Sequence, residues 1–226
     1  MILNRALLRH AAVAGLATAL TIAGSTPARA GGAGGSASAP PSGVGIISIV
    51  QMSGSGCPAN SVGLHAAPDN SSFLLSYRGF QPARLGGGAS PTAVRKNCQV
   101  NVQIQSPPGY SHSIKQVTYR GSAELTSGAT ATVRGHFYRS GAPTPAARTW
   151  TFPGPVQGPW EATAVVEDAA VFWAPCGSPV LQNLSTELRL AWKTADHSTT
   201  NAISMDSPDD DVYSEYQLVW RECSQP

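Results

Sequence analysis

The sequence predicts an all-β fold: an antiparallel β-sandwich of Greek-key or jelly-roll type with two disulfides. Apolar and polar residues alternate with a period of two in the most regular segments, 95–105 and 184–192, as in strands with one buried face. About ten short segments of this kind are separated by glycine- and proline-rich turns. No segment keeps the 3.6-residue period of a long helix, and the four cysteines are the even count that two disulfides need.

Residues 1–30 carry the features of a secretory signal peptide. Arg5 and Arg9 precede an apolar stretch, residues 11–24, which is shorter than the roughly 20 residues of a membrane span. Residues 28–30, Ala-Arg-Ala, then place small side chains where a signal peptidase cleaves. The sequence therefore predicts export, with cleavage after residue 30.

The rest of the chain divides into a linker and one domain. Residues 31–43 are rich in Gly, Ala and Ser, and we expect a flexible tether there. Residues 44–226 are expected to form a single sandwich domain without a further membrane span. Removal of the signal leaves 12 basic and 13 acidic residues, a net charge of −1. This balance gives no basic footprint for nucleic acid.

The segment 95–105 is the most informative strand. Every second residue from Cys98 to Ile104 is apolar or cysteine, and the alternate positions are Asn or Gln. The pattern predicts a strand with one buried face and one hydrated, amide-rich face. Residues 107–109, Pro-Pro-Gly, end the strand because proline cannot donate to a ladder. The segment that follows, 114–123, is predicted to be its hairpin partner.

Composition and alternation predict the remaining elements. Residues 64–70 are expected to form a turn. Residues 150–160 hold two tryptophans, one phenylalanine and three prolines and are expected to be an irregular aromatic stretch. Further strands are predicted at residues 44–52, 73–77, 129–138, 162–166, 171–174, 184–192 and 213–223.

Cys57, Cys98, Cys176 and Cys223 all lie in the expected mature chain. An even count in an exported protein indicates two disulfides, and three pairings are open. We favour Cys57 with Cys98 and Cys176 with Cys223, because each pair closes a moderate loop within one half of the chain. No Cys-x-x-Cys spacing supports a zinc site.

Trp150, Phe152 and Trp160 are candidate ligand-binding residues. Flat aromatic rings on a rigid loop can stack on sugars, and the polar strand faces can supply hydrogen bonds. The alternative is that these rings cover the open end of the core, as tryptophans in β domains mostly do.

Four carboxylates within six positions, Asp206, Asp209, Asp210 and Asp211, form a candidate metal site. They could gather oxygens around a calcium ion, although the spacing is not that of an EF-hand. The alternative is a solvated acidic turn, and no cofactor is otherwise expected.

Several short motifs occur in a characteristic order along the chain. They are residues 54–58 (GSGCP), 95–98 (RKNC), the strand that leads to 108–109 (PG), 119–121 (YRG), 175–177 (PCG), 206–207 (DS) and 220–223 (WREC). The series resembles the family of secreted bacterial and fungal proteins catalogued as domain of unknown function 4360. The resemblance implies export and a shared cysteine framework, and it implies no activity.

The sequence therefore predicts a secreted, non-catalytic binding domain that acts outside the cell or at its surface, with polysaccharide as a possible ligand. Two alternatives are a secreted hydrolase of cell-wall or environmental polymers and a structural or interaction protein of the envelope. No nucleophile elbow or paired-histidine motif favours the enzyme. The ligand, the strand order and the oligomeric state are left open.

Overall fold

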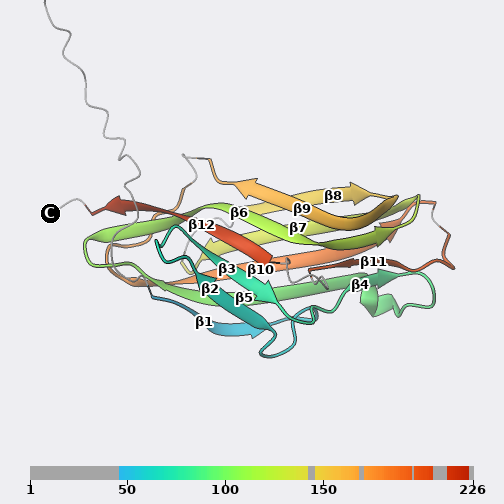
Figure 1. Ribbon diagram of the computed structural model, residues 1–226, viewed down its shortest axis with the longest axis horizontal. Coiled ribbons are helices and arrows are strands. Elements are labelled where there is room, and N and C mark those ends of the chain that lie inside the picture. The colour runs from blue at the N-terminus through green and yellow to red at the C-terminus, as the bar shows by residue number, and fades with distance from the viewer. Residues whose placement is uncertain (1–45, 142–145, 168–170, 195, 206–212, 224–226) are drawn as a thin grey trace, which may run out of the picture. The chain divides into compact units, whose positions relative to one another are not determined.

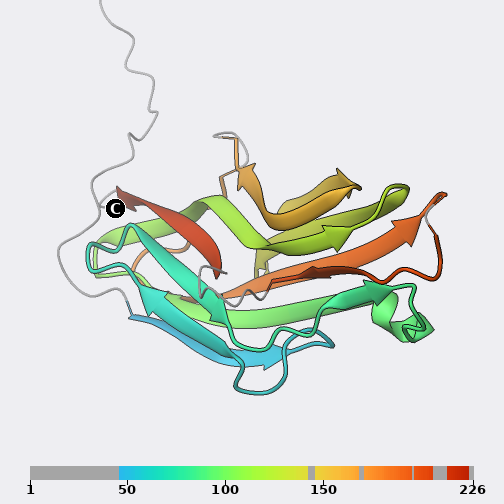
Figure 2. The same cartoon turned by 45° about the vertical axis from the view of Figure 1, so that its right-hand side comes forward.

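The computed structural model describes residues 46–141, 146–167, 171–194, 196–205 and 213–223. In that part of the chain, two antiparallel sheets face each other across a shared core, with one short 3-10 helix (Figures 1 and 2). The predicted all-β sandwich is confirmed. All strands lie within the unit Gly35–Pro226. The predicted signal (1–30) and linker (31–43) lie outside the described residues. No described helix has the length and apolarity that crossing a bilayer requires.

The first sheet has five strands in the order β1-β5-β10-β7-β8. Its two central neighbours, β5 and β10, pair over eleven residues each, from Gln105 opposite Pro179 to Arg95 opposite Arg189. Figure 1 shows β10, in orange, lying beside the green β5 although some 80 residues separate them in the chain. The strands are β1 (Ile46–Ser53), β5 (Arg95–Gln105), β7 (Ala129–Arg139), β8 (Ala146–Pro153) and β10 (Pro179–Trp192).

The second sheet has the order β2-β3-β12-β6-β11-β4, with β9 also paired to β6. Because β9 pairs with residues Gln116 to Leu125 of β6, β12 and β11 share the other edge of β6 and follow each other along it. The strands are β2 (Val62–Ala66), β3 (Ser72–Tyr77), β4 (Ala83–Leu85), β6 (Tyr110–Leu125), β9 (Val156–Val165), β11 (Asn201–Ser204) and β12 (Tyr213–Glu222); the 3-10 helix is η1 (Pro91–Val94).

The chain changes sheet at most connections, which is the behaviour of Greek-key and jelly-roll domains. The predicted hairpin between segments 95–105 and 114–123 is wrong for this reason. Both edges of β5 are occupied by β1 and β10, so β6 crosses to the other sheet. The turn at Pro107 and Pro108 suits this crossing because neither residue can donate a hydrogen bond that would extend the ladder.

Three further segments differ from expectation. Residues 62–66 form β2, so the predicted turn at 64–70 begins late, at the hydrogen bond from the Asn70 amide to the Ala67 carbonyl. Residues 150–160 are regular rather than irregular: β8 ends at Pro153 and β9 begins at Val156 in the opposite sheet. Residues 171–174 are not a strand, although the Ala174 amide donates to the carbonyl of His112 in β6.

The inward-facing side chains form one core, as the period-two pattern predicts. Val100, Val102 and Ile104 of β5 are at most 1% exposed, and so are Leu188 and Leu190 of β10. Each disulfide anchors one end of a strand. Both predicted pairings are confirmed: Cys57 bonds to Cys98, and Cys176 bonds to Cys223. Cys57 and Cys98 are 2% exposed and belong to the core.

Candidate functional site

We take the outward face of the five-stranded sheet as the candidate site, because polar side chains lie on it in regular rows. Because Cys98 and Val100 point inward, the alternate residues of β5 point out, and the same alternation holds in β10 and β7. The strand register places these outward residues in rows of directly opposed side chains. The rows are Asn101–Asn183–Tyr138, Gln99–Ser185–His136, Asn97–Glu187–Arg134 and Arg95–Arg189–Thr132, and we call these twelve residues the amide face.

Hydrogen bonds hold several amide side chains of this face in place. Asn183 lies between Asn101 and Tyr138 and is only 7% exposed, and its Nδ2 donates to Ser140 Oγ at 3.1 Å. Gln99 Nε2 lies 3.5 Å from Asn101 Oδ1, at the limit of a hydrogen bond. The amides are therefore partly ordered before any ligand arrives.

Strand β7 adds a ladder of larger side chains along one edge of the amide face. The rings of His136 and Tyr138 are 5.1 Å apart and inclined by 38°. Partial burial, with the neighbouring Arg134 charge as a second cause, lowers the pKa of His136. The lowered pKa favours the neutral imidazole at pH 7, in which one nitrogen donates and one accepts.

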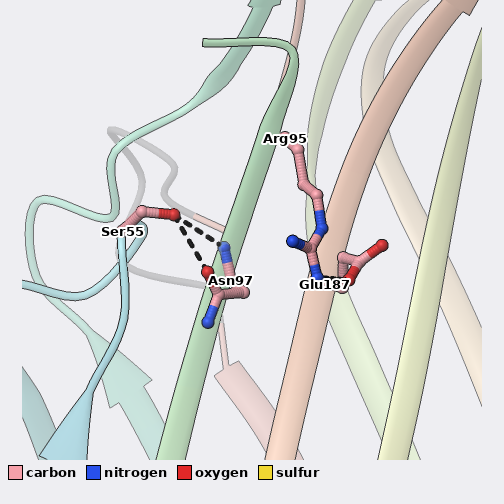
Figure 3. Close-up of polar contacts among 4 residues, drawn as sticks. All are labelled: Ser55, Arg95, Asn97 and Glu187. Carbon is pink, nitrogen blue, oxygen red and sulfur yellow. Dashed lines mark hydrogen bonds and ion pairs between the residues drawn. The ribbon is translucent and has the colours of Figure 1, made fainter. Parts of the chain in front are cut away.

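The other end of the amide face is charged (Figure 3). Arg95 reaches from β5 to Glu187 on β10, and their guanidinium and carboxylate form a close ion pair with side chains 58% and 24% exposed. Beside them, Ser55 Oγ donates to Asn97 Oδ1 at 3.0 Å and accepts from the backbone N–H of Asn97 at 3.2 Å. The loop after β1 thus orients Asn97, and the ion pair orients Arg95.

The three aromatic residues singled out from the sequence lie in the sandwich. Trp160 is 5% exposed, and its indole Nε1 donates to the Ser122 carbonyl at 3.1 Å. Its ring lies 5.7 Å from that of Phe152, and Phe152 and Trp150 are partly buried against the core. This arrangement supports the covering of the core, and a ligand-binding role for the three rings stays a prediction.

The predicted calcium ligands, Asp206, Asp209, Asp210 and Asp211, lie outside the described residues. Calcium binding there stays a prediction. Among the residues with defined positions, no three His, Cys, Asp or Glu side chains gather in a way that could hold a metal ion.

Other groups with side chains that could act in catalysis lie elsewhere in the described chain. Ser106 and His112 are paired, but both are fully buried and closed to a substrate. Glu161 lies in β9 and forms an ion pair with Arg120, and Glu167 lies two residues beyond the end of that strand. A surface depression of about 660 Å³ lies where β6 ends and β9 begins, and Glu124 is the one titratable side chain among its described lining residues.

Comparison with known proteins decides the family. The family described as a domain of unknown function (DUF4360) matches residues 45–223, a range that contains every described residue. This chain belongs to the DUF4360 family. The resemblance seen in the sequence motifs is thereby confirmed.

Relatives and solved structures place this DUF4360 protein in context. It is 26% identical over 175 residues to an uncharacterized secreted protein of Arthroderma benhamiae, covering 77% of this chain and 70% of that one. With the two disulfides, this relative confirms the predicted secreted location. Among solved structures, TmCBM61 in complex with beta-1,4-galactotriose has a TM-score of 0.28 at 8% identity and covers 76% of this chain and 88% of that one.

The enzymatically active domain of the bacteriophage CBA120 tailspike protein 4 gives a TM-score of 0.22 at 13% identity, covering 76% of this DUF4360 chain and 19% of that chain. Both scores are too low for either likeness to bear on the function.

Sequence reasoning recognised polar strand faces but missed their assembly into one surface. The alternation of residues 95–105 marks Gln99 and Asn101 as outward. No local signal shows that Asn183 and Tyr138, far along the chain, lie beside them. Predicting this surface would have required knowing that β5 pairs with β10 and that β10 pairs with β7.

Proposed function

We propose that this secreted protein is a non-catalytic polysaccharide-binding protein and that the sugar chain lies on the amide face. The observation that carries the proposal is the row Asn101–Asn183–Tyr138 with the adjacent row Gln99–Ser185–His136. Together they present amides, a hydroxyl, a neutral imidazole and a phenol ring across three neighbouring strands.

The asparagines on the outward face of β5 and β10 support a binding role for this surface. Asparagine is depleted in strands, and threonine or valine at the same outward positions would favour the sheet. Yet Asn97, Asn101 and Asn183 occupy β5 and β10, two inner strands of the five-stranded sheet. An amide both donates and accepts hydrogen bonds, which suits sugar hydroxyl groups.

Preorganisation and an aromatic ring add to this support. Asn183 is nearly buried and is held by Ser140, so it is a fixed support for the more exposed amides beside it, and its own side chain loses little entropy on binding. Tyr138 is partly exposed beside His136 and can place its ring against the C–H face of a sugar while its hydroxyl stays hydrated.

A polysaccharide screen tests the proposal. The oxidised mature protein is run in affinity electrophoresis through gels that contain neutral or acidic polysaccharides, and hits are measured by calorimetry. We expect Tyr138→Ala and Gln99→Ala to weaken binding each by about tenfold, because each removes a contact group from the centre of the surface.

Matched changes on the outward face of the other sheet serve as controls. Gln116→Ala and Gln217→Ala remove amides of the same kind from β6 and β12. They should leave binding unchanged, and melting curves should show all four variants folded. Binding lost in the control variants and kept in Tyr138→Ala and Gln99→Ala would refute the assignment to the amide face.

A further inference from the structure

The charged end of the amide face carries three arginines on three neighbouring strands. Arg95 of β5 lies directly opposite Arg189 of β10, and Arg134 of β7 lies directly opposite Glu187 of β10. Directly opposed residues of antiparallel strands have Cβ atoms about 5 Å apart. Glu187 therefore lies between Arg95 on β5 and Arg134 on β7. Arg189 lies two positions further along β10.

The positive charge of this cluster is only partly balanced. Of the described outward residues of β5, β7 and β10, Glu187 is the one acid, so the cluster has a net charge of +2. Glu187 pairs with Arg95. Within the part of the chain with defined positions, Arg134 and Arg189 have no ion pair, and both are exposed. Like charges directly opposed in a sheet are unfavourable, and Glu187 balances only Arg95 of the opposed pair Arg95 and Arg189, so an anion bound at Arg189 would relieve the repulsion.

We propose that the polysaccharide is a polymer of uronic acids, whose carboxylates are bound by Arg134 and Arg189 while its hydroxyls meet the neighbouring amides. This inference rests on the proposed function and names its ligand class. The Arg95–Glu187 pair is an internal example of the contact, since a carboxylate already occupies this guanidinium (Figure 3). The planar guanidinium fork matches a carboxylate with two parallel hydrogen bonds.

The arrangement also fits an extended polymer. The arginine rows continue directly into the row Gln99–Ser185–His136, so anionic and neutral contacts lie along the same strands. A polysaccharide that bears a carboxylate and hydroxyl groups on each sugar can contact both the arginine rows and the amide row. The expected mature chain carries a net charge of −1, so attraction of a polyanion depends on this local cluster rather than on the whole protein.

Polygalacturonate and its fully methyl-esterified form are the probes, because they share one backbone and differ in the carboxylate charge. Binding of both is measured by calorimetry at low and moderate salt. Arg134→Gln and Arg189→Gln should each weaken polygalacturonate binding by about tenfold and leave the ester unaffected. Arg78→Gln, an exposed arginine in the turn after β3, is the charge-matched control and should change neither.

Glu187→Gln gives a change of opposite sign. It removes the one acid and releases Arg95, so polygalacturonate should bind more tightly, by about threefold or more for one charge contact. Weaker binding of polygalacturonate by this variant would overturn the inference, because Glu187 would then be a contact for sugar hydroxyls.

The outcomes separate this inference from the proposed function. Equal binding of polygalacturonate and its methyl ester, weakened by Tyr138→Ala but not by the arginine variants, would overturn the uronate assignment and keep the polysaccharide. Binding of dextran sulfate or single-stranded RNA as tight as that of polygalacturonate would also overturn it, since the cluster would then select charge alone. Absence of binding to every polysaccharide would remove both proposals.

Discussion

His112 Nδ1 and Ser106 Oγ lie 2.6 Å apart at the turn between β5 and β6, and neither residue has any exposed surface. The ring of His112 also packs 5.6 Å from that of Trp220, and within the described chain its Nε2 has no hydrogen-bond partner. A buried imidazole in this setting is neutral. The pair is thus a structural contact, which fixes the segment between β5 and β6 against the core where the chain crosses from one sheet to the other.

Protonation of this histidine should oppose folding. Burial, with the Arg139 charge as a second cause, lowers the pKa of His112 to about 4 from its ordinary 6.5. Well above pH 6.5 the ring is neutral in both states and the full stability is present. As the pH falls from 6.5 to 4, the unfolded chain takes up a proton that the folded chain does not, so the free energy of unfolding falls by about 3 kcal/mol.

Urea unfolding at pH values from 4 to 8 measures this loss, and NMR titration of the His112 ring gives its pKa directly. His112→Gln should be less stable at neutral pH but should lose less stability on acidification. Parallel pH profiles for the wild type and the variant would show that other groups cause the acid sensitivity.

Gly135 should not tolerate a side chain. A Cβ added there would lie 2.5 Å from Cε2 and Oη of Tyr119, which projects from the opposite sheet into this position. We expect Gly135→Ala to destabilise the fold by about 1–3 kcal/mol through overpacking. Urea unfolding checks the value, with the outward Ser185→Ala as a control expected to change stability by about 0.5 kcal/mol or less. A more stable Gly135→Ala variant would contradict the close packing.

Trp160 should contribute mainly to stability. It is 5% exposed, contacts Phe152 and donates to the Ser122 carbonyl. We expect Trp160→Ala to cost about 3–5 kcal/mol, through the cavity that it leaves and the loss of the indole hydrogen bond. Tyr138→Ala, on the partly exposed amide face, should cost far less. A small loss of stability for Trp160→Ala in denaturant unfolding would contradict this structural role.

The two disulfides should differ in access to reductant. Cys57 and Cys98 are 2% exposed, whereas Cys176 is exposed at the surface and Cys223 is partly exposed. Brief treatment of the folded protein with dithiothreitol, followed by alkylation and peptide mapping, should therefore label Cys176 and Cys223 first. Equal labelling in the denatured protein is the control. Earlier labelling of Cys57 or Cys98 would indicate that the region around Gly56 opens readily.

Sequence reasoning anticipated which face of each regular strand is buried. The inward positions from Cys98 to Ile104 in β5 and from Leu184 to Leu190 in β10 are all buried, as predicted. It missed the strands at residues 150–160, because three prolines and two glycines there indicate irregular chain. The prolines are accommodated at a strand end, at a corner between sheets and on β9, a strand with one unpaired edge in the described sheet.

By itself, the sequence determined the alternation of side chains, the disulfide-bonded character of the exported domain and the amide-rich face of β5. These properties are local, since they depend on a period of two residues and on composition. Only the tertiary structure decided that β5 lies between β1 and β10, and that Asn101, Asn183 and Tyr138 form one row. Strand partners are chosen by packing between residues far apart in the chain, and a short-range pattern contains no information about that choice.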